Sequence, residues 1–126
     1  MDKIITIDGK EVGFRATALT PRIYRHKMGR DMIRDLNSLR VAYNKAANIS
    51  KDATEEEREE AQLSGLDLEI FENAAYIMAK QYDTSLPETP EEWLDEFRTF
   101  VIYEILPEIL DLWGMNTKTT ATPKKK

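Results

Sequence analysis

The sequence contains no cysteine and a single histidine, His26. The missing cysteines exclude disulfide frameworks, thiol catalysis and cysteine-ligated metals, and one histidine is too few for a histidine-clustered metal site. No run of about 18 apolar residues occurs, because charged residues and a proline interrupt the most apolar stretch, 97–113, so we expect no membrane-spanning helix. The first residues include acids and lack the apolar run of a signal peptide, which favours a reducing, intracellular location.

Charge is abundant in this chain, and it is distributed unevenly. The 126 residues are 41% hydrophobic and 33% charged, which is typical of one globular domain. Behind the net charge of -5, residues 1–51 carry 11 Lys/Arg against 5 Asp/Glu, residues 52–116 carry 3 against 18, and residues 117–126 carry four lysines and no acid. A basic front, an acidic middle and a basic tail point to electrostatic partners or self-association.

The first twenty residues have the pattern of a β-hairpin. Residues 3–7 are rich in β-branched side chains, and Asp8-Gly9 is a dipeptide favoured in two-residue hairpin turns. Residues 10–17 then alternate apolar and polar side chains, so they form the expected second strand. Because two strands alone are only marginally stable in water, this hairpin must pack on helices or on another chain.

Residues 20–47 predict one amphipathic helix. Thr20 is a suitable capping residue, and Pro21 suits the first helical turn. Gly29 would lie in the helix interior, where we expect close packing or a bend. The apolar stripe comprises Tyr24, Met28, Met32, Leu36, Leu39 and Tyr43. The basic outer face comprises Arg22, Lys27, Arg30, Arg34 and Arg40.

Further helices follow a polar linker at 48–54. Residues 54–57 have the form of a capping box and begin an acidic, solvated segment at 55–60. Residues 64–82 predict a helix whose buried positions are Leu66, Ile70, Phe71, Ala74, Ile77 and Met78. A second capping box at 89–92 begins a last helical region that extends to Trp113, and Pro107 should kink or split it.

Together these patterns predict a mainly α protein with an N-terminal β-hairpin, an α+β fold built as a small single-domain helical bundle. We expect residues 1–115 to form the hairpin plus helical domain. Residues 116–126 have threonines, a proline and lysines without apolar periodicity, so we expect a disordered basic tail.

Two alternative functions arise from the charged segments. Glu56-Glu57-x-x-Glu60 and Glu92-x-x-Asp95 resemble the Mg²⁺-binding carboxylates of all-helical nucleoside triphosphate pyrophosphohydrolases, although no apolar face anchors the first of them. The basic face at 22–34 is compatible with a nucleic-acid-binding regulator, but the sequence pI near 5.0 argues against nucleic acid as the partner. We find no catalytic, cofactor-binding or metal-binding motif beyond these, which favours a non-enzymatic binding role.

Three segments carry a resemblance to a protein family: residues 24–35 (YRHKMGRDMIRD), 71–80 (FENAAYIMAK) and 92–97 (EWLDEF). In their order and spacing the chain resembles the tail assembly chaperones of siphophages and prophages of low-GC Gram-positive bacteria. The resemblance implies a mostly helical, non-enzymatic protein that binds the long tape measure protein and keeps it soluble. It also implies action in the cytoplasm of the bacterial host and absence from the mature virion.

The resemblance implies partners as well. Such proteins help tail tube subunits polymerise around the tape measure protein, often through a longer, frameshifted form, and Lys124-Lys125-Lys126 is compatible with a slippery coding sequence. An apolar groove that binds the client is expected from Leu94, Phe97, Val101 and Trp113, with Arg30 and Arg34 as further contacts. We also expect a homo-oligomer in which basic and acidic surfaces of neighbouring copies meet.

Overall fold

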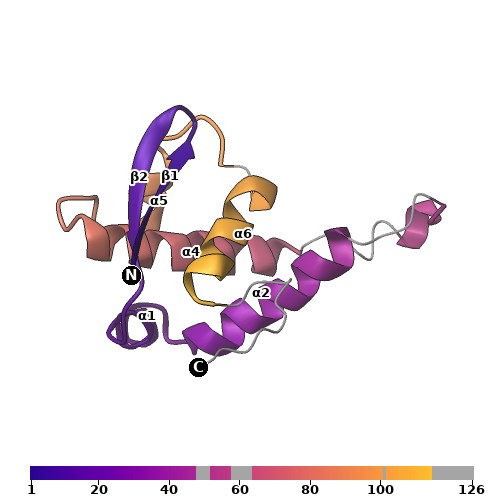
Figure 1. The fold of residues 1–126 in the computed structure, drawn as a ribbon, viewed down its shortest axis with the longest axis horizontal. Helices are drawn as coiled ribbons and strands as arrows, with labels where there is room; N and C mark the ends of the chain where they lie inside the picture. Colours follow the sequence, from indigo (N-terminus) through magenta and orange to yellow (C-terminus); the bar gives the residue numbers. More distant parts are fainter. Residues whose placement is uncertain (48–51, 58–63, 101, 115–126) are drawn as a thin grey trace, which may run out of the picture.

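The computed structural model describes residues 1–47, 52–57, 64–100 and 102–114 (Figure 1). The expected tail at 116–126, the linker residues 48–51 and the acidic residues 58–60 lie outside this part. The elements are β1 (Asp2–Ile7), β2 (Lys10–Arg15), α1 (Thr20–Met28), α2 (Met32–Ala47), α4 (Gly65–Tyr82), α5 (Pro90–Leu94) and α6 (Ile102–Leu112). The predicted class, mainly α with an N-terminal hairpin, is confirmed.

The hairpin forms as its sequence predicts. β1 and β2 pair antiparallel, with Ile5 opposite Val12, around a two-residue turn. Asp8 (φ 54°) and Gly9 (φ 79°) both adopt the positive φ that this kind of turn requires. Ile5, Ile7 and Phe14 are buried, so the alternating face of the hairpin faces the core.

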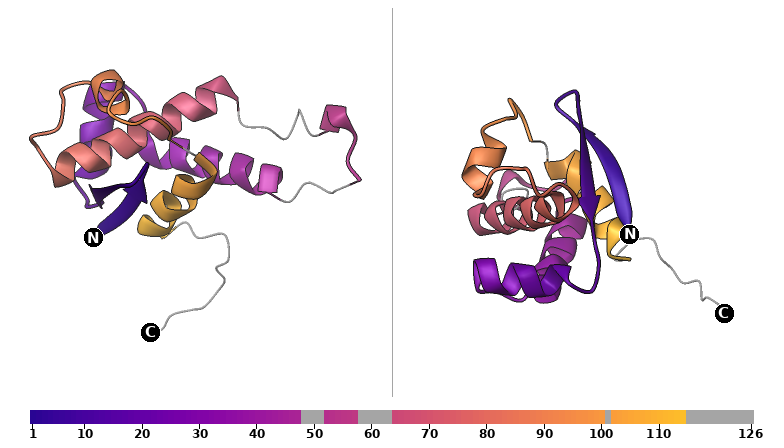
Figure 2. Two further views of the ribbon diagram at one scale, coloured as in Figure 1. Left: turned by 90° about the horizontal axis from the view of Figure 1, so that it is seen from above. Right: turned by 90° about the vertical axis from the view of Figure 1, so that its left-hand side faces the viewer.

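Helix α4 is the centre around which the other elements pack. It contacts β2, α1, α2, α5 and α6, and Figure 2 shows it between the hairpin on one side and α1 and α2 on another. Its residues Phe71, Ala74, Ala75, Tyr76 and Met78 are at most 1% exposed. Burial around most of its circumference explains why α4 is the least amphipathic of the long segments.

The prediction of one helix over residues 20–47 is wrong, because the helix is interrupted at Gly29. α1 ends there in a left-handed residue (φ 70°), whose N–H donates to the carbonyl oxygen of Arg25 at 2.8 Å. Gly29 is therefore a helix C-cap. The apolar stripe is nevertheless confirmed, with Tyr24, Met32, Leu36 and Leu39 buried and Met28 and Tyr43 half-buried.

The expected cap at Thr20 is also wrong. Leu19 occupies the capping position and makes no side-chain cap bond. The Thr20 hydroxyl is instead buried and donates to Gln81 Oε1 of α4 at 2.5 Å, while it accepts the N–H of Thr17 at 2.9 Å. A long-range contact with α4 has replaced the local one that the sequence suggested.

We predict that Gly29→Ala lowers the free energy of unfolding by about 1–2 kcal/mol, because alanine is strained at positive φ. A Cβ at this position would have no atom within 4 Å, so the cost comes from the backbone alone. Urea denaturation followed by circular dichroism measures it. Gly65→Ala is the matched control, since Gly65 begins α4 without a positive φ and is equally unobstructed. Equal midpoints for both variants would contradict the prediction.

The last helical region divides at a different place from the one expected. α5 ends at Leu94, and α6 continues past Pro107 to Leu112, so the break precedes Ile102 and Pro107 does not split the helix. Two contacts with the hairpin hold the backbone between α5 and α6. Asp8 Oδ2 accepts the backbone N–H of Arg98 at 2.9 Å, and Lys10 Nζ donates to the carbonyl oxygen of Glu96 at 2.5 Å.

Helix starts are predicted better than the burial near them. Thr54 and Glu57 bond reciprocally through side chain and backbone, which confirms the first capping box, and Thr89 Oγ1 accepts the N–H of Glu92 at 3.2 Å. The expected burial of Leu66 is wrong, because it lies in the first turn of α4, before the packed part of the helix, and is 57% exposed. The other predicted positions of this helix are buried.

Candidate protein-binding surfaces

Trp93 of α5 is the centre of an aromatic cluster. Its ring centroid lies 5.3 Å from that of Phe97, 5.4 Å from Phe100, 5.9 Å from Tyr76 and 6.5 Å from Phe14. Trp93 is 1% exposed, so it belongs to the core. Its packing ties α5, α4 and the hairpin together and thereby positions the residues that follow it.

The residues expected to line a client groove fall into two places. Leu94 and Phe97 are half-buried and adjoin each other, with the Phe97 N–H donating to the Leu94 carbonyl oxygen at 3.1 Å. Trp113 follows the C-terminal end of α6, roughly 16 Å along that helix from its start, and its indole N–H lies 3.1 Å from Met78 Sδ. Val101 lies outside the described residues.

A cavity of about 220 Å³ lies beside Phe97, between the hairpin and the ends of α4 and α5. Lys10 Nζ lies 5.2 Å from the centroid of the Phe97 ring at its margin. The lining combines apolar side chains with charged ones: Lys10, Glu11, Val12, Gly13, Tyr82, Asp83, Leu86, Trp93, Glu96 and Phe97. An apolar floor with a charged margin suits an apolar side chain of a protein partner.

Arg30 lies in the turn between α1 and α2 and has a structural role there. Its Nε and Nη2 donate to the Asp35 carboxylate at 2.7 and 2.9 Å, and the Tyr24 hydroxyl donates to the same carboxylate at 2.9 Å. Burial raises the pKa of Asp35, but the bonds from Arg30 and Tyr24 outweigh it and leave the pKa below its usual value. Burial and the Asp35 contact raise the pKa of Tyr24, so its hydroxyl stays protonated and donates.

The sequence pattern did not predict this network of Arg30, Asp35 and Tyr24, because it placed Arg30 on the solvated outer face of the helix. Asp35 is 4% exposed, and a buried carboxylate needs partners. The sequence feature that could have indicated the network is Asp35, an acid directly before Leu36 of the apolar stripe. Arg34, the other expected contact, is exposed, and its side chain makes no ion pair with any described residue.

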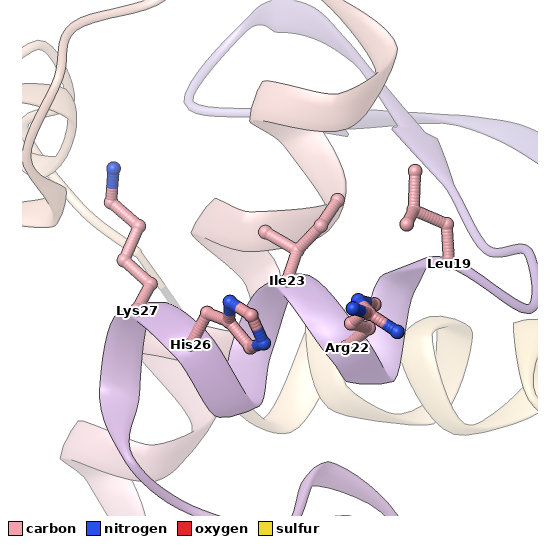
Figure 3. A pocket seen from close by; sticks show the side chains of 5 residues that line it. All are labelled: Leu19, Arg22, Ile23, His26 and Lys27. Atoms are coloured by element: carbon pink, nitrogen blue, oxygen red, sulfur yellow. The ribbon is translucent and has the colours of Figure 1, made fainter.

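A second groove, of about 420 Å³, runs along α1. Figure 3 shows Leu19, Ile23 and Lys27 directed to one side of the helix, with Arg22 and His26 on the adjoining side. Leu19 is 52% exposed, and Ile23 is half-buried. His26 is exposed, as its position among basic residues predicts. The groove thus has an apolar floor and a cationic margin.

The described carboxylates of the pyrophosphohydrolase alternative make local contacts or remain in solvent. Glu56 and Glu57 are exposed, Glu60 lies outside the described residues, and Glu92 bonds Thr89 at the start of α5. Within the described part of the chain, no group of three or more His, Asp or Glu residues could hold a metal ion. No helix of that part is long and apolar enough to cross a membrane.

Among the described residues, apolar openings with charged margins lie at α1 and beside Phe97. Neither brings together a nucleophile, a base and an orienting group. Comparison of the chain with protein-family models, with curated proteins and with solved structures finds no match.

Proposed function

We propose that this protein is a phage tail assembly chaperone that binds the tape measure protein, keeps it soluble and assists polymerisation of the tail tube, without enzymatic activity. The resemblance of residues 24–35, 71–80 and 92–97 carries the proposal. These segments are close in space: Lys27 Nζ lies 5.9 Å from the Tyr76 ring centroid, and the Tyr76 ring lies 5.9 Å from that of Trp93. The three segments that carry the resemblance therefore pack next to one another in the fold.

The client surface in this proposal is the cavity beside Phe97 together with Leu94. A tape measure protein is long and helical, and it exposes apolar stripes before the tube encloses it, so a chaperone needs apolar openings with charges around them. Phe97, Val12 and Leu86 supply the apolar wall of the cavity, and Lys10 with Glu96 supplies the charged margin. Arg34 of α2 and Trp113 would be further, separate contacts, since neither lines this cavity.

The remaining parts of the proposal follow from the same resemblance. A longer, frameshifted form of the protein would recruit tail tube subunits to the client. Both forms would act in the cytoplasm of the bacterial host and would be left out of the finished virion. Mass spectrometry of purified virions tests the last point, because detection of this chain at the abundance of a structural protein would contradict it.

Co-expression with the tape measure protein tests the proposal directly. We expect the client to move from the insoluble to the soluble fraction and to co-purify with this chain. Leu94→Lys should reduce the co-purified client several-fold, because it places a charge on the apolar surface beside Phe97. Lys45→Glu is the matched control, since Lys45 is an exposed residue of α2 outside the client surface. A client that neither becomes soluble nor co-purifies with the wild-type chain overturns the proposal.

A further inference from the structure

A sheet of two strands has two outer edges, and in this hairpin the two edges differ. β2 packs against α4, and the ring of Tyr82, the last residue of that helix, occupies the space that a side chain at Gly13 would need. Arg15 Cζ lies 5.4 Å from the centroid of the same ring. Helix α4 and Tyr82 therefore cover β2.

The outer edge of β1, in contrast, carries backbone groups without a partner. Met1 and Ala16 exchange N–H···O bonds of 2.8 Å, and from there bonded and non-bonded pairs alternate towards the turn. Asp2, Ile4 and Thr6 belong to the non-bonded pairs, so their N–H and C=O groups point away from β2. No hydrogen bond joins the backbone of these three residues to another described residue. β1 therefore presents an unpaired strand edge.

Helix α6 contacts β1 on the buried face of the hairpin. Lys3 Nζ lies 2.6 Å from Glu108 Oε1 of α6, and because side chains alternate along a strand, Ile4 points to the opposite face. Ile4 is 52% exposed, and Asp2 and Thr6 are exposed as well. Natural proteins protect such an edge with an outward lysine, a proline or a bulge. β1 has neither a proline nor a bulge, and its lysine is bound to α6.

We propose that β1 of one copy of this chain pairs antiparallel with β1 of a second copy, with Ile4 opposite Ile4 at a two-fold axis, so that the two hairpins form one continuous sheet. Asp2 then lies opposite Thr6 of the second copy, and every such pair exchanges N–H···O bonds in both directions. The exposed isoleucines pack against each other across the axis, and the Asp2 carboxylate faces a hydroxyl group. The contact thus pairs the backbone groups and buries the apolar side chain that one copy leaves exposed.

The side chains of β1 favour this register and a second copy as the partner. A two-fold axis at Asp2 would place two carboxylates opposite each other, which is destabilising. An axis at Thr6 would bring Ile4 against Asp8, which has a positive φ and lies in the turn. With the axis at Ile4 no like charges are opposite, and Arg15 already balances the charge of Asp2, with Nε 2.9 Å from Asp2 Oδ1. The strand is therefore complementary to itself.

The proposed contact closes at the dimer, because both copies use the same edge, and α4 and Tyr82 cover the other strand. It differs from an assembly of basic against acidic surfaces, since backbone hydrogen bonds and apolar packing hold it together. The edge is short, so we expect a dissociation constant on the order of 10 µM. We expect no weakening in about 1 M salt, where contacts between exposed charges are screened.

Charge substitution at Ile4 in the full chain tests the proposal by sedimentation equilibrium. Ile4→Lys and Ile4→Glu should each weaken self-association roughly tenfold or more, because each places like charges opposite at the axis. An equimolar mixture of the two variants should associate again, since opposite charges then meet, and this recovery excludes misfolding. Val41→Lys is the control, because Val41 of α2 is 54% exposed, and it should self-associate like the wild type. A wild type that is monomeric at about 1 mM, or a mixture that fails to associate, overturns the proposal.

The lack of cysteine in the chain allows a second test. Paired residues of this kind have Cα atoms about 5.5 Å apart, within the roughly 4.4–6.8 Å that a disulfide spans. Under mild oxidation Ile4→Cys should form a disulfide-linked dimer, whereas the equally exposed Val41→Cys should stay mostly monomeric; equal linkage overturns the proposal. Ile4 lies outside the client surface beside Phe97, so a monomeric Ile4→Lys that co-purifies with the tape measure protein leaves the proposed function intact. A dimeric wild type that fails to bind the client overturns only that function.

Discussion

Replacing Trp93 by alanine is expected to lower the free energy of unfolding by about 4 kcal/mol, within the range typical of buried tryptophans. The side chain is 1% exposed, and its ring packs against Phe14, Tyr76, Phe97 and Phe100. Truncation leaves a cavity bordered by four rings from three segments, which cannot all move inward together. The urea midpoint should fall by about 2 M, measured by far-ultraviolet circular dichroism because the substitution removes a fluorophore.

The consequence extends to the proposed client surface. Leu94 and Phe97 follow Trp93 directly, and α5 is only five residues long, so its position depends on this one anchor. Trp113→Ala is the matched control, because Trp113 is half-buried and outside the cluster. We expect Trp113→Ala to lower the free energy of unfolding by about half as much as Trp93→Ala does. Equal midpoints for Trp93→Ala and the wild type would show that the aromatic cluster does not hold α5.

Where local chemistry decides the structure, the sequence was sufficient. Asp8-Gly9 requires no distant partner to form a turn, and Thr54 and Thr89 cap helices through residues three positions away. The stripe from Tyr24 to Leu39 predicted the correct buried face even though the helix is divided at Gly29. The same face remains buried because the interruption keeps both parts against α4.

Distant contacts account for what the sequence did not reveal. The Thr20 hydroxyl bonds Gln81 rather than its own helix, and the turn at Asp8 binds the backbone at Arg98, ninety residues away in sequence. No local pattern encodes either pairing. The candidate surfaces show the same limit. Phe97 was expected in a groove formed by apolar residues of the last helical region, whereas the opening beside it needs Val12 and Tyr82 from elements far apart in the chain.

The second large effect is expected at Asp35. Asp35→Asn should lower the free energy of unfolding at pH 7 by about 2–3 kcal/mol, because it removes the charge that strengthens the bonds from Arg30 and Tyr24. The introduced amide could still accept one of these bonds, while the guanidinium of Arg30, at 45% side-chain exposure, would regain water. Asp83→Asn is the matched control, since the Asp83 side chain is exposed and bonds Ser85, two residues away; we expect little change.

The dependence of this loss on pH identifies its cause. Burial raises the pKa of Asp35, but the bonds from Arg30 and Tyr24 outweigh burial and hold this pKa below the ordinary value of 3.8. A lowered pKa means that the folded state binds the proton less readily than the unfolded state, so the stabilisation is present above about pH 4 and is lost as the pH falls through the folded-state pKa. The difference between wild type and Asp35→Asn should therefore be constant from about pH 8 to 5 and shrink towards about pH 2. Other carboxylates titrate equally in both proteins and cancel. If the difference in unfolding free energy between the two proteins is as large near pH 2 as at neutral pH, the loss comes from the shape of the side chain and not from its charge.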